Sequence, residues 1–186
     1  KDTVVIMTDF SFPKDDMIRL KKESKQFIWI DHHISKINEL KDIEFDGLRV
    51  DGTAACVLTW IFFMKDNNPP ISIRLIGDYD IWNLTQSVLC MQYGIRQYDC
   101  EPENQIFWKD VFENNNLTKE IIEKGETIYK YVTKTYKHEI NSIGFITELC
   151  VELNEKLHTY NVLAVNRSHI SSLFFEDHPE VNNVDI

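Results

Sequence analysis

The sequence has little of what marks membrane, secreted or low-complexity chains. Its six Gly and five Pro are too few for a low-complexity chain of 186 residues. No apolar run reaches the roughly 18 residues of a membrane span, and Lys1-Asp2 leads into a strand-like segment without a signal-peptide pattern. Hydrophobic residues make up 43% of the chain and aromatic residues 12%, which is enough for a packed core. We therefore expect a globular, cytoplasmic protein with no membrane contact.

Cysteines are few and lie far apart in the sequence. The four of them include no C-x-x-C pair, so neither a zinc knuckle nor a redox pair is indicated. Cys56 lies among apolar residues, which favours burial as a small hydrophobic side chain. We expect ordinary thiols.

Basic residues are outnumbered by acidic ones. The chain has 20 Lys and Arg against 30 Asp and Glu, for a formal net charge of -10 and a pI near 5.0. Sequence-independent affinity for long nucleic acid comes mainly from clustered Lys and Arg. This balance therefore argues against long-DNA binding, and it is compatible with a short phosphorylated substrate or one bound through metal ions.

The beginning of the chain has the pattern of an α/β protein with a parallel sheet. Residues 4–8 and 27–30 are short apolar runs typical of buried strands, and each is followed by an Asp. Pro13 begins a helix between them, with Asp15 and Asp16 in its first turn. A strand, a helical crossover and a second strand form the βαβ unit of a doubly wound sheet.

Several helices are predicted after this unit. Residues 54–64 form a largely buried helix capped by Thr53. The apolar segment 71–76 is too short to assign to helix or strand. An amphipathic pattern predicts another helix at 102–114.

The remainder predicts a long helix and a second, smaller unit. Residues 118–138 carry apolar side chains at helical spacing on a polar background. Strand character returns at residues 145–149, 160–165 and 171–175. We therefore expect a parallel-sheet domain at 1–115, a connecting helix at 116–138 and part of a smaller α/β domain at 139–186.

Acids and histidines follow the apolar runs at three places. The candidates are Asp9, Asp31, His32, His33, Asp78 and Asp80. Open α/β sheets place their ligands at the carboxyl ends of the strands, so these side chains predict one site. Carboxylate and imidazole ligands without nearby thiols favour Mn²⁺, with Mg²⁺ as an alternative. Two such cations can activate water and neutralise phosphoryl oxygens.

Each candidate also has a structural interpretation. Asp9 can cap the helix that follows it, and Asp78 and Asp80 can be turn residues. Arg167, after the predicted strand at 160–165, is either a phosphate ligand or a solvated side chain. Trp82 either stacks on a base or packs in the protein.

The triplet Asp31-His32-His33 after strand 27–30, with Asp9 upstream and Gly77-Asp78 downstream, resembles the DHH phosphoesterases. The resemblance covers most of residues 1–100. It implies a DHH catalytic domain at 1–115, a DHHA1-like substrate-binding domain at 139–186, and two Mn²⁺ ions.

The resemblance also implies roles for individual residues. Asp9 would bridge the two ions, His32 would bind one of them, and Asp78 would be a further ligand, with Asp80 as the alternative. His33 would face the substrate phosphate or the leaving group. Asp31 would orient His32 from behind, as carboxylates commonly do for metal-bound imidazoles.

Two family motifs have no counterpart in this sequence. The first motif, a strand and loop with one His and two Asp ligands, would precede Lys1, and the C-terminal GGGH segment is also absent. We therefore expect a family member trimmed at both ends. Residues 77–82, Gly-Asp-Tyr-Asp-Ile-Trp, are closest to the oligoribonuclease-like branch.

The function implied by the resemblance is hydrolysis of phosphodiester bonds in short oligonucleotides. An exopolyphosphatase or pyrophosphatase acting on another small phosphorylated substrate is one alternative. A catalytically inactive nucleotide-binding regulatory module is another. The oligomeric state stays open, with a homodimer among the alternatives.

Overall fold

The fold is mixed α/β and consists of two compact units. The structure is a computed structural model that describes residues 2–168, 171 and 173–175. The units are Lys1–Glu126 and Thr127–Ile186. The division between them falls inside the long helix α7 (Asn115–Ile143), which confirms the predicted helix at 118–138 and extends it at both ends.

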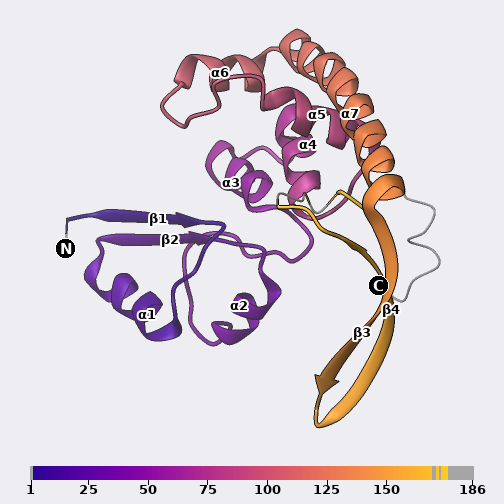
Figure 1. Cartoon of the computed structure of the whole chain (residues 1–186). Coiled ribbons are helices and arrows are strands. Elements are labelled where there is room, and N and C mark those ends of the chain that lie inside the picture. Colours follow the sequence, from indigo (N-terminus) through magenta and orange to yellow (C-terminus); the bar gives the residue numbers. More distant parts are fainter. Residues whose placement is uncertain (1, 169–170, 172, 176–186) are drawn as a thin grey trace. The chain divides into compact units, whose positions relative to one another are not determined.

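The first unit begins with the predicted βαβ element (Figure 1). Strands β1 (Val4–Thr8) and β2 (Gln26–Ile30) are parallel and in register, and α1 (Lys14–Glu23) connects them. Pro13 is the N-cap of α1, and Asp15 and Asp16 lie in its first turn. Beyond β2, isolated parallel bridges to Asp46 and Arg49 extend the sheet.

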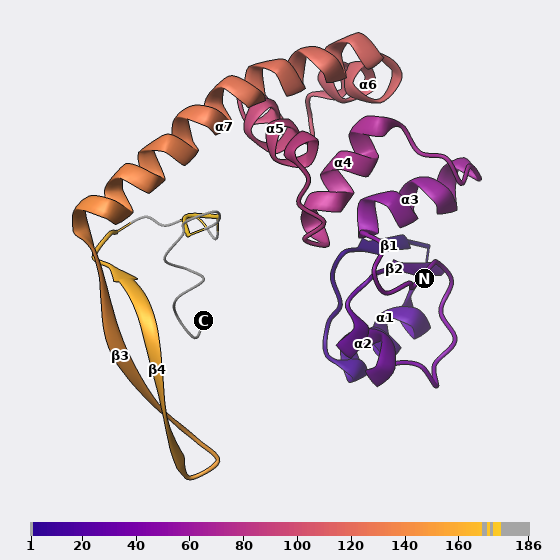
Figure 2. The same ribbon diagram turned by 90° about the vertical axis from the view of Figure 1, so that its right-hand side faces the viewer.

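Helix α1 and the short helix α2 (Ile34–Glu39), which was not predicted, cover one face of the β1–β2 pair (Figure 2). Met7 of β1 and Phe27 and Trp29 of β2 pack on this side with Met17 of α1 and with Leu40. The alternation of strand side chains sends every second residue of each strand into this cluster.

Helix α3 (Ala55–Met64) covers the other face of β2. Ile28 and Ile30 pack there against Leu58 of α3. Val4 and Ile6 of β1, on the same face, are 48% and 52% exposed. Strand β2 is therefore buried on both faces, and β1 is an edge strand with one face open.

Helices α4, α5 and α6 and the first part of α7 form the rest of the first unit. Their side chains make a separate apolar core. Segment 71–76, left open by the sequence, belongs to α4 (Ile71–Asp80). The helix predicted at 102–114 is confirmed as α6 (Gln105–Glu113), whereas α5 (Gln86–Ile95) was not predicted. The core residues are Leu75, Val88, Met91, Ile95, Phe107, Val111 and Ile121.

Helices α5 and α7 approach each other at glycines. A Cβ atom on Gly125 would lie 1.7 Å from the carbonyl oxygen of Cys90, and one on Gly94 would lie 1.9 Å from that of Ile121. Both contacts are with backbone, which cannot rotate away as a side chain can. The helices can pack this closely only because both positions lack a side chain.

The predicted N-cap of α3 is wrong. Ala54, not Thr53, occupies that position, and no side chain bonds the first turn. The prediction that this helix is largely buried is also wrong, because Ala55 and Leu58 are its buried residues, whereas Phe63 and Met64 at its end are exposed. Some apolar side chains of this helix therefore do not pack against the sheet.

The second unit contains an antiparallel hairpin of β3 (Gly144–Leu153) and β4 (Lys156–Val165). Asn154 and Glu155 form its turn, both with positive φ, of 51° and 62°, as two-residue turns of twisted hairpins require. The strands at 145–149 and 160–165 are confirmed. Residues 173–175 form a turn and not the predicted strand, and Ser172 lies outside the described residues.

In the described part of the chain, the helices lack the combination of length and apolar character that a bilayer crossing requires.

The close approach of α5 and α7 predicts the effect of Gly125→Ala. Overpacking against backbone should lower the free energy of unfolding by about 1–3 kcal/mol, despite the roughly 1 kcal/mol gain in helix propensity. Urea unfolding followed by circular dichroism measures this. Glu123→Ala, on the exposed side of the same helix, is the control and should change stability by less than about 0.5 kcal/mol. Equal stability of the two variants would contradict the packing argument.

Candidate metal centre

The parallel register of β1 and β2 brings the two strand ends together. Thr8 pairs with Ile30, so Asp9 and the Asp31-His32-His33 triplet leave the sheet at the same edge. The backbone N–H of Asp9 donates to the carbonyl oxygen of Ile30 at 3.0 Å. Asp9 has a φ of 57°, a left-handed conformation that Asp tolerates better than most residues. Asp9 does not cap α1, so that structural interpretation of its position is wrong.

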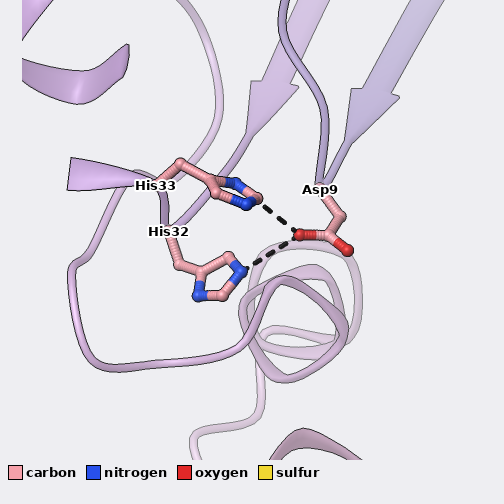
Figure 3. A group of neighbouring side chains, drawn as sticks. All are labelled: Asp9, His32 and His33. Atoms are coloured by element: carbon pink, nitrogen blue, oxygen red, sulfur yellow. Dashed lines mark hydrogen bonds and ion pairs between the residues drawn. The ribbon is translucent and has the colours of Figure 1, made fainter. Parts of the chain in front are cut away.

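Asp9 lies against both histidines (Figure 3). Its Oδ1 atom is 3.1 Å from Nε2 of His32 and 3.9 Å from Nδ1 of His33. One ligand atom from each of the three residues lies within 4.8 Å of the others. Three side chains of metal-binding type therefore converge at the carboxyl edge of the sheet, where the sequence predicted them.

Asp31 supports this group from inside the protein. Its side chain is fully buried, and Oδ2 accepts a hydrogen bond from Nε1 of Trp29 at 3.1 Å. Its Oδ1 atom accepts bonds from the backbone N–H groups of His32 and His33, and lies 2.7 Å from Nδ1 of His33. Burial works to raise the pKa of Asp31, but hydrogen bonds from His33, His32 and Trp29 outweigh it and lower the pKa.

The carboxylate of Asp31 orients His33 and not the ring of His32. The hydrogen bond to Asp31 raises the pKa of His33, against the smaller opposing effect of burial. The charges of Asp31, Asp9 and Asp80 act in the same direction. His33 is 53% exposed, so its ring is held by Asp31 and still reaches solvent. The expectation that Asp31 holds the ring of His32 is wrong in this geometry, where it bonds only the backbone N–H of that residue.

Asp80 joins the group and Asp78 does not. Oδ2 of Asp80 is 3.3 Å from Nε2 of His32, whereas Oδ1 of Asp78 accepts a hydrogen bond from the side chain of Asn83. Both acids lie in the last turn of α4, not at a strand end as expected. Residues two apart on a helix do not share a face, so only one of them can point to the strand ends.

The two carboxylates at the centre destabilise each other. Burial raises the pKa of Asp80, and the nearby charge of Asp9 raises it further, while His32 and His33 act in the opposite direction. A divalent cation would relieve this repulsion. Carboxylates together with an imidazole suit a cation such as Mn²⁺, so Asp9, His32 and Asp80 fit the metal that the sequence predicts.

A cavity of about 1210 Å³ adjoins the centre. Asp9 and Asp80 contribute to its wall, which is otherwise mainly apolar and comes from β1, α3, α4, α5 and α6 and the segment before α6. The sequence did not reveal this cavity, because its residues come from segments far apart in the chain. The unusually apolar helix at 55–64 was the one signal, and it was interpreted as core.

Cys56 lines this cavity and is exposed, so the prediction of burial is wrong for this residue. Its accessible surface faces the cavity, while the surrounding protein still disfavours the thiolate. Burial raises the pKa of the Cys56 thiol to about 11. The charges of Asp80 and Asp9 act in the same direction, which is consistent with its place beside the metal centre.

Arg167 and Trp82 are two further candidates. Arg167 forms an ion pair with Glu139 and stacks on the rings of Tyr136 and Phe174, so it is not the free, solvated side chain that the sequence left as one alternative. Trp82 is exposed and lies 6.3 Å from the ring of Tyr79, and it does not line the cavity.

A comparison with protein-family models, curated proteins and solved structures finds no match for the chain.

The contact between Asp31 and His33 predicts the effect of Asp31→Asn on titration. The ionised carboxylate stabilises the imidazolium, so its loss should lower the pKa of His33, and the ring should lose its proton at a lower pH than in the wild type. An NMR pH titration of the histidine resonances in metal-free protein measures this. An unchanged or higher pKa for His33 would show that Asp31 does not hold its proton.

Proposed function

We propose that the chain is a metal-dependent phosphoesterase of the DHH type that hydrolyses phosphodiester bonds in short oligonucleotides. The observation that carries this proposal is the convergence of Asp9, His32 and Asp80 from two strand ends and a helix end. The DHH relationship itself rests on the Asp31-His32-His33 triplet with Asp9 upstream and Gly77-Asp78 downstream in the sequence.

Asp9, His32 and Asp80 would hold a divalent cation, with Mn²⁺ favoured over Mg²⁺ because two of the nearby donors are imidazoles. The sequence left Asp78 and Asp80 as alternative metal ligands. Asp80 is the better candidate, because it contacts His32, whereas Asp78 accepts a hydrogen bond from Asn83. When bound, such a cation supplies Lewis acidity, which polarises a phosphoryl group and activates water.

His33 is the candidate proton donor to the leaving group. Its raised pKa keeps the ring protonated closer to neutral pH, which is where a general acid is most effective. The side chain is half exposed and is held by the 2.7 Å contact with Asp31. Asp31 is therefore a positioning residue, because it touches His33 and is itself fully buried.

The residues around the centre favour an organic phosphoester over an inorganic polyphosphate. A chain of phosphates needs several Lys or Arg side chains to neutralise it. Among the described residues that line the adjoining cavity, Lys109 is the one basic side chain, and aromatic residues are more numerous. Polyphosphate hydrolysis is therefore the second candidate activity.

Asp80 and Asp78 provide a matched pair for testing the metal centre. Asp80→Asn should weaken Mn²⁺ binding by at least about 10–100-fold, because loss of a ligand should cost no less than loss of a residue that only orients one. Asp78→Asn makes the same chemical change two residues away and should bind Mn²⁺ like the wild type. Elemental analysis and titration calorimetry measure the difference. If the protein binds no Mn²⁺, the enzyme hypothesis fails and the regulatory-module alternative is favoured.

Substrate class is tested by supplying a five-nucleotide RNA and an inorganic polyphosphate in parallel, with Mn²⁺ present. We expect release of mononucleotides and little release of phosphate from polyphosphate. His32→Ala should reduce nucleotide release by roughly 10–100-fold. Chromatography of the products provides the measurement. Cleavage of polyphosphate alone would reverse the order of the two candidates, and no cleavage of either would reject the phosphoesterase proposal.

A further inference from the structure

The cavity beside the metal centre is large enough to hold a ligand, and its lining is mainly apolar. Its volume of about 1210 Å³ exceeds the roughly 300–1,000 Å³ of common small-molecule pockets. All of its lining residues belong to the first compact unit. The cavity therefore does not depend on how the two units are arranged.

Two residues belong both to the cavity and to the metal centre. Asp9 and Asp80 line the cavity wall, and each also contacts His32 within 3.3 Å. A phosphoryl group at the centre would therefore have its ester substituent next to the cavity. The cavity has no comparable second group of acids and histidines among its described lining residues.

One wall of the cavity is a continuous row of aromatic rings. The rings of Trp60 and Phe112 have centroids 6.3 Å apart, and those of Phe112 and Trp108 are 5.8 Å apart. Phe63 of α3 also lines the cavity and is 45% exposed. Rows of exposed aromatic rings bind flat groups by stacking, and every nucleobase has such a face.

Polar groups on the same wall can bond the edge of a flat heterocycle. Gln92 of α5 and Gln105 of α6 both line the cavity, and a side-chain amide carries donors and acceptors together. Ligand sites commonly combine an apolar lining with a few such polar groups. An inorganic phosphate chain would leave this lining unused.

We propose that this cavity binds a nucleobase of the substrate whose phosphate would bind the cation held by Asp9, His32 and Asp80. The inference rests on the proposed function for the position of the phosphate, and it adds the site that recognises the organic part. Stacking on Trp60, Phe63, Trp108 and Phe112 provides affinity that tolerates different bases, and it distinguishes nucleotides from phosphates without a base.

Two cysteines allow a direct test. Cys56 is an exposed residue of the cavity wall, whereas Cys150 is exposed on the hairpin. In metal-free protein at mildly alkaline pH, adenosine 5′-monophosphate at saturation should suppress alkylation of Cys56, because a base bound in the cavity covers the thiol. The rate at Cys150 should not change. Mass spectrometry of tryptic peptides measures both rates in one sample.

Ribose 5-phosphate is the matched ligand because it has the same sugar and phosphate and lacks the base. It should leave both alkylation rates unchanged. Equal protection by the two compounds, or none by the nucleotide, would overturn the proposal.

Phe63→Ala tests the aromatic wall without disturbing the core. Phe63 is 45% exposed, so the variant should fold, and the nucleotide concentration for half-protection should rise about tenfold. Phe145→Ala, which removes a 55% exposed ring from β3, should leave that concentration unchanged.

If RNA is cleaved and Cys56 is not protected, the base binds elsewhere and the enzyme proposal survives. Protection without cleavage supports the base site and removes the catalytic role.

Discussion

The candidate site depends on the in-register parallel pairing of β1 and β2. That pairing ends both strands at one edge, so that Asp9 meets His32 and His33 although Asp9 and His32 are 23 positions apart in the sequence. The pairing in turn depends on β2 being covered on both faces, by the cluster around Trp29 on one side and by Leu58 on the other. A shift of one residue would turn every side chain of β2 to the wrong face and separate the acids from the histidines.

The protein stabilises the negative charge of one carboxylate at this edge and disfavours that of another, because the pKa of Asp31 is lowered and that of Asp80 is raised. Asp31 is buried and accepts several hydrogen bonds, so its negative charge is stabilised within the protein. Asp9 and Asp80 lie near each other and face the cavity with histidines as their polar partners. The first arrangement holds a side chain in place. The second leaves negative charge that a cation can neutralise, which is why the two outer acids are the proposed ligands.

Local signals predicted the two strands that carry Asp9 and the histidines. The apolar runs at β1 and β2, and Pro13 with the acids after it, specify a strand, a helix and a strand through contacts close in sequence. The convergence of Asp9 and the histidines then follows from the geometry of any parallel sheet. Helix α5 was missed, although Thr85 accepts a hydrogen bond from its first turn, because no strongly amphipathic pattern marks it.

Other features required the packing of distant segments. Whether Asp78 or Asp80 reaches His32 depends on the rotation of α4 against its neighbours, and the sequence does not encode that rotation locally. The exposure of Cys56 depends in the same way on a cavity built from several elements. From its residues alone, the chain specifies a βαβ unit with acids and histidines at one edge. Only the tertiary structure selects Asp80 and opens an aromatic cavity beside it, because helix rotation and cavity shape arise from contacts between residues far apart in sequence.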